Sequence, residues 1–465
     1  MKANLTVADQ IRSAFSAAMS VMYRNEVPAY GKLMELVAQV NDDVLVRNPE
    51  LRIRLSQTDA LARISDERHG AIRVGTRSEL TMIRRIFAVM GMHPVGYYDL
   101  STAGVPVHAT AFRPIGEEPL SVNPFRVFAS LLRLDLIADE ALRREAAAIL
   151  EARQIFTAEA IALTEKAECD GTLSAPDAKR FVSEVLETFR WHGEAHVNSG
   201  MYKRLHDAHR LIADVVSFRG PHINHLTPRT LDIDQVQKLM PANGISPKAV
   251  IEGPPRRRCP ILLRQTSFKA LEEPVKFWDV GNNLGMGAHT ARFGEVEQRG
   301  IALTKKGRAL YDELLREVHH RIRPAPDGSN ATEYQTVLSE IFQAFPDSWN
   351  DIRRLQLGYF RYTLTNHVKR KIGSVDVEAL IAEGVIRFDP ITYEDFLPVS
   401  AAGIFQSNLG DNAQHTFEAN PSQKNFESDL GVPVLDEFDH YAAMEQASLD
   451  ACLAASTLTL AAERV

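Results

Sequence analysis

The hydrophobic and polar positions along the chain divide it into helical and strand-like stretches. Residues 8–40 place apolar side chains such as Ile11, Phe15 and Met19 at the three- and four-residue spacing of an amphipathic helix. Shorter runs rich in β-branched and aromatic residues follow, separated by Gly and Pro: "GAIRVGT", "VMGMHPVGYYDL" and "VPVHATAF". Residues 65–115 are therefore predicted to form strands and turns around one helix.

A second helical stretch comes next. Apolar stripes at helical spacing, with Asn, Asp or Pro near their starts, run through "NPFRVFASLLRLDLI", "DEALRREAAAILEARQ" and "APDAKRFVSEVLETFRWH". Strand-like runs return in "HRLIADVVSFRGPHINHLT", "PILLRQTSFKA" and "HTARFGEVEQRG". The segment "TKKGRALYDELLREVHHRI" is predicted to be a helix with Thr304 as its N-cap. Beyond residue 375 we expect a mixture of short strands and helices.

These elements predict an α+β fold with two β-rich blocks on either side of a helical insertion. Two β-blocks of similar size suggest a duplicated sheet module that closes round a shared site. A chain of 465 residues exceeds what one core usually supports, yet we expect its parts to act as a single catalytic unit, residues 1–465. The predicted parts are the N-terminal helices (1–60), the first β-block (61–118), the helical insertion (119–212), the second β-block (213–302) and a helical and mixed C-terminal region (303–465).

Composition narrows the class of protein. Hydrophobic residues make up 45% of the chain and charged residues 24%, which is ordinary for a globular protein. The three cysteines, Cys169, Cys259 and Cys452, are too widely spaced for a zinc motif and fit a reducing, cytoplasmic location. The longest apolar stretch, "ACLAASTLTLAA", is too short and too polar to span a bilayer, so we expect no membrane partner.

Two features bear on nucleic-acid binding. One is the basic run Arg256-Arg257-Arg258, and the other is "RGIALTKKGRALYDELL", which is locally similar to winged-helix regulators. The run is short, and we expect it to be a solvated turn. No basic recognition helix precedes the second segment, a helix capped by Thr304 explains it, and the net charge is -7. We therefore expect no nucleic-acid partner.

His69 and Arg73 form the first candidate pair for chemistry. They are four residues apart, so they share one face whether the segment is a helix or a strand. A neutral imidazole binds metals, and a guanidinium presents a planar fork to a carboxylate. The same short spacing is also typical of a surface histidine beside a solvated arginine.

The segment "GPHINHL" offers two more histidines. If it is a strand, His222 and Asn224 face one way while Ile223 and His225 face the other. The prolines on either side leave little room for a helical turn. We therefore expect one metal ligand here, either His222 or His225, with the other histidine structural.

A carboxylate is available in "RFGEVEQRG". Glu295 and Glu297 fall on one face of the predicted strand, and a carboxylate that faces a core needs an ion pair or a metal. Glu297, nearer the end of the strand, is expected to lie at a solvent-facing acidic edge. Two histidines and one carboxylate with open coordination positions are the ligand pattern of non-haem Fe(II) oxygenases.

Longer motifs carry a resemblance to a known family. The chain resembles the 2-oxoadipate dioxygenase/decarboxylase family, the D-2-hydroxyglutarate synthases of lysine catabolism. That family is similar to the vicinal-oxygen-chelate enzymes, which implies a β half-barrel around one metal. The resemblance rests on "ERHGAIRVGT", "VMGMHPVGYYDLSTAGVPVHATAFRP", "FRGPHINHLTPRTLDID", "PILLRQTSFKALEE", "HTARFGEVEQRGIALT" and "YEDFLPVSAAGIFQSNLG".

The resemblance implies a ligand set and a reaction. Fe(II) would be held by His69, His225 and Glu295, and it would be the only cofactor. Arg73 would be the catalytic residue that contacts the substrate. The substrate site would comprise His69, Arg73, His225, Val399 and Ser400.

The implied partners are small molecules. A 2-oxo dicarboxylic acid, 2-oxoadipate, and O2 would give (R)-2-hydroxyglutarate and CO2. The alternative is an oxygen-independent isomerase or lyase on the same scaffold, with Zn, Ni or Mn as a Lewis acid. The identity of the metal and the demand for oxygen distinguish the two.

Overall fold

The computed structural model describes residues 6–57, 60–268, 272–279, 283–290, 292–325, 327–365, 376–397 and 423–462. They form a mixed helix and sheet structure that divides into two compact units. The first unit comprises Met1–Glu252, Gln265–Gln298 and Phe396–Leu435, and the second comprises Gly253–Arg264, Arg299–Asp395 and Asp436–Val465. Within the described residues, no helix is long and apolar enough to cross a membrane.

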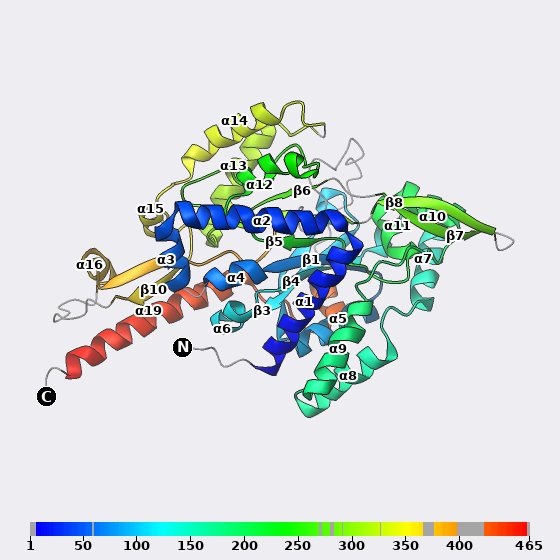
Figure 1. Ribbon diagram of the computed structural model, residues 1–465, viewed down its shortest axis with the longest axis horizontal. Helices are drawn as coiled ribbons and strands as arrows, with labels where there is room; N and C mark the ends of the chain where they lie inside the picture. The colour runs from blue at the N-terminus through cyan, green and yellow to red at the C-terminus, as the bar shows by residue number, and fades with distance from the viewer. Residues whose placement is uncertain are drawn as a thin grey trace. The chain divides into compact units, whose positions relative to one another are not determined.

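The first unit contains most of the described strands, and Figure 1 shows the helices and strands of the chain. Its strands are β1 (Arg68–Val74), β2 (Met92–Asp99), β3 (Val107–Pro114), β4 (Arg126–Leu132), β5 (Leu226–Pro228), β7 (Glu272–Asp279) and β8 (Asn283–Thr290), with most of β6 (Leu263–Ser267) and β9 (Glu295–Arg299). Its helices are α1 (Val7–Glu26), α2 (Pro28–Arg47), α3 (Pro49–Gln57), α4 (Ala60–Asp66), α5 (Arg77–Val89), α6 (Glu117–Val122), α7 (Glu140–Ala152), α8 (Ala158–Asp170), α9 (Ala175–Glu187), α10 (Ser199–Ala208), α11 (Arg210–Ser217), α12 (Ile233–Leu239) and α18 (Gln423–Leu430).

A five-stranded sheet in the order β2-β3-β4-β1-β5 organises this unit. β4 runs parallel to β1, and the other neighbours are antiparallel. Just beyond β5, Arg229 forms a parallel bridge with Glu297 of β9, and β9 in turn pairs with β6. β1, β5 and β9 are therefore neighbours, although they are far apart in the sequence.

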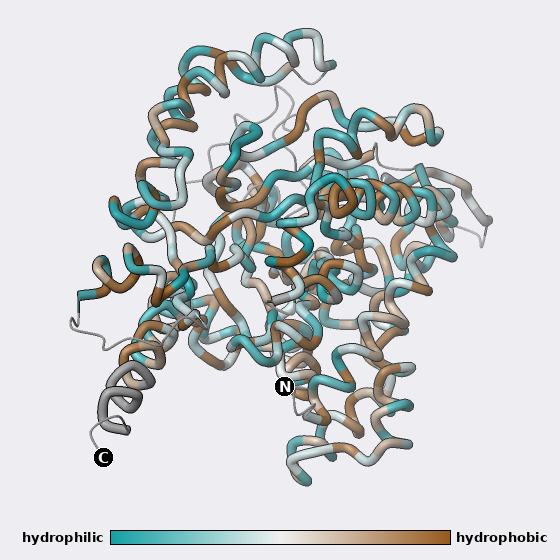
Figure 2. Tube along the Cα trace, turned by 60° about the vertical axis from the view of Figure 1, so that its left-hand side comes forward, coloured by the Kyte–Doolittle hydropathy of each residue, from teal (hydrophilic) through white to brown (hydrophobic). Residues whose placement is uncertain are grey.

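Helices cover the sheet with an apolar core. Phe15 of α1, Phe87 of α5 and Phe112 of β3 belong to one buried cluster that also includes side chains of α2 and α9. Figure 2 shows the corresponding alternation of hydrophobic and hydrophilic residues along the helices. Burying one face of an amphipathic helix supplies most of its stability in a protein.

The N-terminal segment forms two helices where the sequence pattern predicted one. α1 ends at Glu26 and α2 begins at Pro28. Proline has no amide hydrogen to donate in a helix interior, but it is suited to the first turn of a helix. The first helix therefore ends before Val27 and a second begins at Pro28. The start of α1 is fixed by Thr6 and Asp9, whose side chains and backbone amides bond reciprocally.

Two secondary-structure predictions are wrong. The stretch 126–132 was predicted to be helical but is β4, buried along its whole length between β3 and β1. The stretch 210–217 was predicted to be a strand but is helix α11, whose residues from Leu211 to Ser217 are all buried. Both are continuous apolar runs, and burial on every side removes the periodicity that separates a helix from a strand.

Other predictions are confirmed. β1, β2 and β3 surround helix α5 as expected for residues 65–115, and α7 and α9 form in the predicted insertion. In the second unit Thr304 caps helix α13, accepting a hydrogen bond from the amide of Gly307 at 3.1 Å. The described residues beyond 375 mix short strands and helices, as predicted.

The second unit is mainly helical. Its helix α19 packs on β10, whose Phe360 amide donates a hydrogen bond to Glu445 of that helix. The basic run at 256–258 matches the predicted solvated turn only in part. Arg256 and Arg258 are exposed, but the side chain of Arg257 is 5% exposed and donates to the carbonyl oxygen of Phe345 at 2.7 Å. The remaining elements are α13 (Lys305–Arg321), α14 (Ala331–Ile341), α15 (Trp349–Arg354), β10 (Phe360–Leu364), α16 (Val377–Ala382), β11 (Ile386–Pro390) and α19 (Glu437–Ala462).

Candidate metal centre

His69 lies on β1, an inner strand of the five-stranded sheet. β1 pairs with β4 on one side and with β5 on the other, and His69 has no exposed surface. Its ring packs edge-on against the ring of Phe396, with the two centroids 4.9 Å apart. The ring nitrogens are therefore shielded from bulk water and need partners inside the protein.

His225 immediately precedes β5 and lies close to β1. The amide of Asn224 donates a hydrogen bond to the β1 backbone at 2.9 Å. Gly70 permits this approach, because a Cβ at that position would lie 2.5 Å from Ile223 and 2.8 Å from the carbonyl oxygen of His225. The ring of His225 is fully buried, and its centroid lies 5.5 Å from that of His69.

Glu295 begins β9 and is also fully buried. The side-chain amide of Gln265 on β6 donates to its Oε1 at 2.5 Å. The preceding residue, Gly294, packs so closely that a Cβ there would lie 1.8 Å from the ring of Phe268. Burial raises the pKa of Glu295, although the neighbouring imidazole of His69 opposes that effect.

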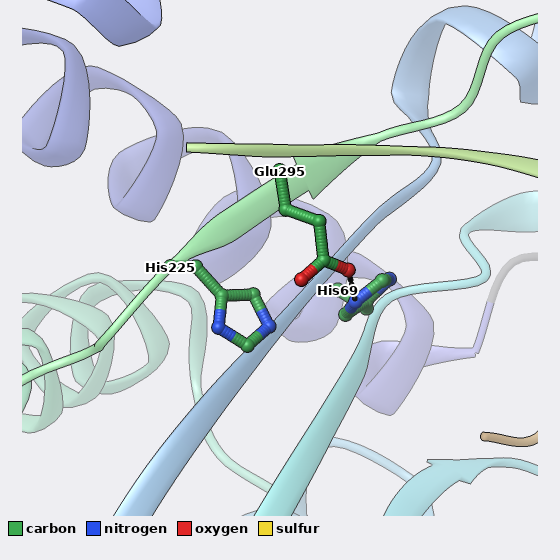
Figure 3. Close-up of side chains that lie close together, drawn as sticks. All are labelled: His69, His225 and Glu295. Carbon is green, nitrogen blue, oxygen red and sulfur yellow. Dashed lines mark ion pairs between the residues drawn. The ribbon is translucent and has the colours of Figure 1, made fainter. Parts of the chain in front are cut away.

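These three side chains converge on one point (Figure 3). One candidate ligand atom from each lies within 4.8 Å of the others, and His69 Nε2 is 3.4 Å from Glu295 Oε1. Within the described residues, the ring nitrogens of both histidines and one oxygen of Glu295 have no hydrogen-bond partner. Buried polar atoms without partners are costly, and a divalent metal would engage one nitrogen of each ring and an oxygen of Glu295. Two imidazoles and a carboxylate suit several divalent transition metals.

The two histidines differ in their electrostatic surroundings. Burial lowers the pKa of His225 well below its usual value, and the nearby charges of His69 and Arg73 lower it further. Its ring is therefore neutral at neutral pH and able to bind a metal. Burial also disfavours the charged form of His69, but Glu297 and Glu295 outweigh that effect and raise its pKa. Binding a metal would require His69 to be unprotonated.

Glu297 was predicted to lie at a solvent-facing edge, but it does not. It is fully buried, its Oε1 is 3.2 Å from Nδ1 of His69, and it accepts a hydrogen bond from Arg126 at 3.0 Å. Arg126 also donates to Glu67 at 2.8 Å. The prediction was wrong because alternation along β9 cannot reveal an arginine on β4 that neutralises the carboxylate. Glu297 faces the nitrogen of His69 on the side away from Glu295, where it helps to fix the orientation of the ring.

The segment 219–230 contributes one histidine to the cluster, as predicted. That histidine is His225, whereas His222 lies outside the cluster, with its Nε2 3.4 Å from a carboxylate oxygen of Asp214. Asn224 is buried beside His222, with the two side-chain nitrogens 3.2 Å apart. Residues 221–225 form no strand, so the alternation argument assumed the wrong backbone conformation, although only His225 joins the cluster.

Arg73 shares a face of β1 with His69, as its spacing predicted. Its Nη1 donates to Asp214 of α11 at 2.7 Å, and its side chain is 11% exposed. Val399 and Ser400, the other two predicted substrate contacts, lie outside the described residues.

Sequence reasoning missed several buried polar residues around the site, namely Glu67, Arg126, Asp214 and Gln265. One signal was available, because Arg126 is a lone charge in the apolar run "FRVFASLL" and a buried charge needs a partner. No spacing rule identifies that partner. Glu67 and Asp214 are recognisable only once the strands and helices are assembled.

A mixed α and β fold that gathers two histidines and one glutamate in a buried cluster is typical of a metal-dependent enzyme. Residues 15–408 match the 2-oxoadipate dioxygenase/decarboxylase family. The chain belongs to this family, and the protein is an enzyme.

Curated relatives named 2-oxoadipate dioxygenase/decarboxylase match almost the whole chain. The protein from Pseudomonas putida is 55% identical over 457 residues, covering 97% of each chain. The protein from Escherichia coli strain K12 is 56% identical over 454 residues, covering 97% of this chain and 99% of the relative.

Solved structures agree with this assignment. The hydroxyglutarate synthase from Pseudomonas putida superimposes with a TM-score of 0.88 at 50% identity, covering 98% of this chain and 100% of that one. The hydroxyglutarate synthase from the same organism in complex with 2-oxoadipate superimposes with a TM-score of 0.89 at 52% identity, with the same coverage.

Proposed function

We propose that this enzyme is an Fe(II)-dependent dioxygenase/decarboxylase of lysine catabolism that converts 2-oxoadipate and O2 to (R)-2-hydroxyglutarate and CO2. The observation that carries the proposal is the buried cluster of His69, His225 and Glu295, whose candidate ligand atoms lie within 4.8 Å of one another. It occurs in a chain more than half identical to relatives named for this reaction.

The three side chains would hold Fe(II) through two imidazole nitrogens and one carboxylate oxygen. Three protein ligands leave coordination positions open for a 2-oxo acid and O2. Bound Fe(II) would supply the redox chemistry that activates O2 and drives loss of CO2. The protein supplies coordination, orientation and exclusion of water.

The other residues of the site would orient the substrate. Arg73 would bind a carboxylate of 2-oxoadipate, because a charge-assisted contact with a guanidinium is stronger than a neutral hydrogen bond. Phe396 and Phe293, whose rings lie 4.9 Å from those of His69 and His225 respectively, would keep water out. Val399 and Ser400 are proposed to shape the pocket around the rest of the substrate.

We further propose that the strands around the site form a half-barrel of the vicinal-oxygen-chelate kind, and that the whole chain acts as one catalytic unit. The bridge from Arg229 to Glu297 supports the first point by joining the five-stranded sheet to β9. The 97% mutual coverage with the Pseudomonas putida relative supports the second. Cys169, Cys259 and Cys452 form no disulfide, which fits the proposed cytoplasmic location.

The decisive experiment measures oxygen uptake by protein reconstituted anaerobically with Fe(II), with 2-oxoadipate added last. We expect one O2 consumed for each CO2 and each 2-hydroxyglutarate formed. His225→Ala, carried through the same reconstitution, is the control and should consume no oxygen with this substrate.

The oxygen-independent isomerase or lyase remains the competing function, since two histidines and a glutamate also bind Zn, Ni or Mn. Wild-type protein that holds iron but consumes no oxygen with 2-oxoadipate would contradict the dioxygenase proposal and favour that alternative.

A further inference from the structure

A second buried polar cluster lies beside the candidate metal centre and includes Arg73. Its centre is Asp214 of helix α11, which is 7% exposed. Around it lie His289 of β8, His222, and Tyr202 of helix α10. None of these four residues belongs to the ligand set of the metal centre.

The two carboxylate oxygens of Asp214 have different partners. Oδ2 accepts a hydrogen bond from Nη1 of Arg73 at 2.7 Å. Oδ1 is 2.9 Å from Nε2 of His289 and 3.4 Å from Nε2 of His222. Oδ2 of Asp214 therefore faces Arg73, which lies on the same strand as His69. Oδ1 is held by His289 and His222, which lie on other segments of the first unit.

His289 is held at both ring nitrogens. A carboxylate only accepts hydrogen bonds, so Nε2 of His289 donates to Asp214, and in the tautomer with its single proton on Nε2 the other nitrogen, Nδ1, is an acceptor. The hydroxyl of Tyr202 lies 2.8 Å from that Nδ1 and can donate to it. The plane of Trp191 is within 5° of parallel to the imidazole, with centroids 6.1 Å apart. This support restricts the positions that Asp214 can take.

The charges in this cluster favour an ionised Asp214 opposite Arg73. Burial alone would raise the pKa of Asp214, but the hydrogen bond from His289 and the charge of Arg73 contribute to holding it well below its usual value. Burial lowers the pKa of His222 to about 3, so that ring is neutral at neutral pH. Arg73 therefore faces a fixed, negatively charged acceptor.

We propose that Asp214 is a positioning residue that holds the Arg73 guanidinium in the orientation that receives a carboxylate of the substrate. The inference rests on the proposed function, in which Arg73 binds 2-oxoadipate. A guanidinium has five N–H donors in one plane, so a contact at Nη1 is compatible with a second carboxylate at another edge. With Asp214 fixed by His289, the plane of that guanidinium is set before the substrate arrives.

The competing explanation is a buried ion pair that only stabilises the fold. The two explanations differ in whether the effect of Asp214 depends on Arg73. A positioning residue acts through the arginine, so removing it from a chain that already lacks Arg73 should change substrate binding no further. A purely structural residue would lower stability in either background without a specific effect on KM.

The test compares wild-type protein with Asp214→Ala, Asp214→Asn, Arg73→Ala and the Arg73→Ala/Asp214→Ala double variant, all loaded with Fe(II). The measurements are kcat and KM for 2-oxoadipate from oxygen uptake, and Kd for 2-oxoadipate without oxygen by calorimetry. Asp214→Ala should raise KM and Kd about tenfold or more, as expected for a lost charge-assisted contact, with a smaller change in kcat. Asp214→Asn keeps one acceptor oxygen and should recover part of that loss.

The double variant should match Arg73→Ala alone in Kd. Asp9→Ala is the matched control, because it also removes a buried ion pair, with Arg12 at 2.6 Å, and should leave KM unchanged. An unchanged KM and Kd in Asp214→Ala, or additive effects in the double variant, would overturn the inference. Should Asp214→Ala not fold, wild-type constants in Asp214→Asn would overturn it equally.

The same measurements distinguish a failure of the proposed function from a failure of this inference. Wild-type protein that neither binds nor consumes 2-oxoadipate would overturn the proposed function and this inference together. Wild-type protein that binds 2-oxoadipate while Asp214→Ala binds it equally well would overturn the inference alone.

Discussion

At the scale of single residues, the site combines ligands with the residues that orient them. His69 has Glu295 3.4 Å from one ring nitrogen and Glu297 3.2 Å from the other. Arg126 neutralises Glu297, which allows two carboxylates to stay buried beside one imidazole. The arrangement matches the carboxylate–histidine–metal pattern, in which the outer carboxylate sets the tautomer and the angle of the ring.

Removing a ligand should abolish tight metal binding. In His225→Ala the affinity for Fe(II) is expected to fall about 100-fold or more, because each ligand carries a large share of the binding free energy. Anaerobic competition against a chelating dye measures the dissociation constant. An affinity equal to that of wild type would exclude His225 from the ligand set.

Glu297 should tune the metal without binding it. Glu297→Gln is expected to weaken Fe(II) binding by about 10- to 100-fold, the usual effect of losing an outer carboxylate. Glu79→Gln is a matched control, since Glu79 is also a buried glutamate paired with an arginine, Arg153, and is not a candidate ligand. Equal loss of metal affinity in both variants would show that the effect is only destabilisation.

At the scale of elements, close backbone approach brings the ligands together. The segment ending at His225 reaches β1 because position 70 carries no side chain, and Glu295 is positioned where Gly294 meets the ring of Phe268. These glycines are needed for space, since a Cβ at either site would overlap its neighbours.

Gly70→Ala should therefore displace His225. We expect weaker Fe(II) binding and a lower melting temperature, because the added Cβ would lie 2.5 Å from Ile223. Gly31→Ala in helix α2 is the control, where the nearest atom is a flexible side-chain carbon of Arg24 at 3.4 Å. Metal affinity that survives Gly70→Ala unchanged would mean that this approach does not position the ligand.

β3 carries a buried histidine that should make stability depend on pH. Burial, helped by the charge of Arg133, lowers the pKa of His108 to about 4. An unfolded chain has a histidine pKa of about 6.5, so the stabilisation is complete above that pH and is lost as pH falls toward 4. The contribution of this residue is at most about 3 kcal/mol.

His108→Gln should show a shallower loss of stability than wild type between pH 6.5 and pH 4, the two values set by the unfolded and folded histidine. Urea unfolding at a series of pH values measures the free energy of unfolding of each protein. If the stability of His108→Gln and of wild type fell equally with pH, the lowered pKa of His108 would not be the cause of the pH dependence.

At the scale of the whole molecule, the candidate ligands come from positions 69, 225 and 295. β1, β5 and β9 are brought together by the sheet and by the bridge between Arg229 and Glu297. A metal bound there would link strands that are distant in sequence, so its binding free energy would add to the stability of the first unit.

Chelation should therefore lower thermal stability. At a free Fe(II) concentration about 100-fold above Kd, binding is expected to stabilise the protein by about 2.7 kcal/mol. Differential scanning calorimetry under anaerobic conditions should show a melting transition that falls on addition of a chelator and recovers with Fe(II). Glu295→Ala should show neither change, and a chelator response in that variant would place the stabilising metal elsewhere.

The sequence by itself determined the family and much of the local structure. Its long motifs led to the ligand candidates His69, His225 and Glu295, and the four-residue spacing of His69 and Arg73 predicted their shared face. It also predicted the helix capped by Thr304, because capping and strand alternation are short-range effects that depend on nearby residues.

The tertiary structure decided what depends on distant partners. Only the assembled sheet shows that 126–132 is a strand and 210–217 a helix, since continuous apolar runs have no period to read. Only packing brings Arg126 to Glu297 and Asp214 to Arg73. Whether a charged side chain is buried depends on its neighbours in space, which local patterns along the chain do not specify.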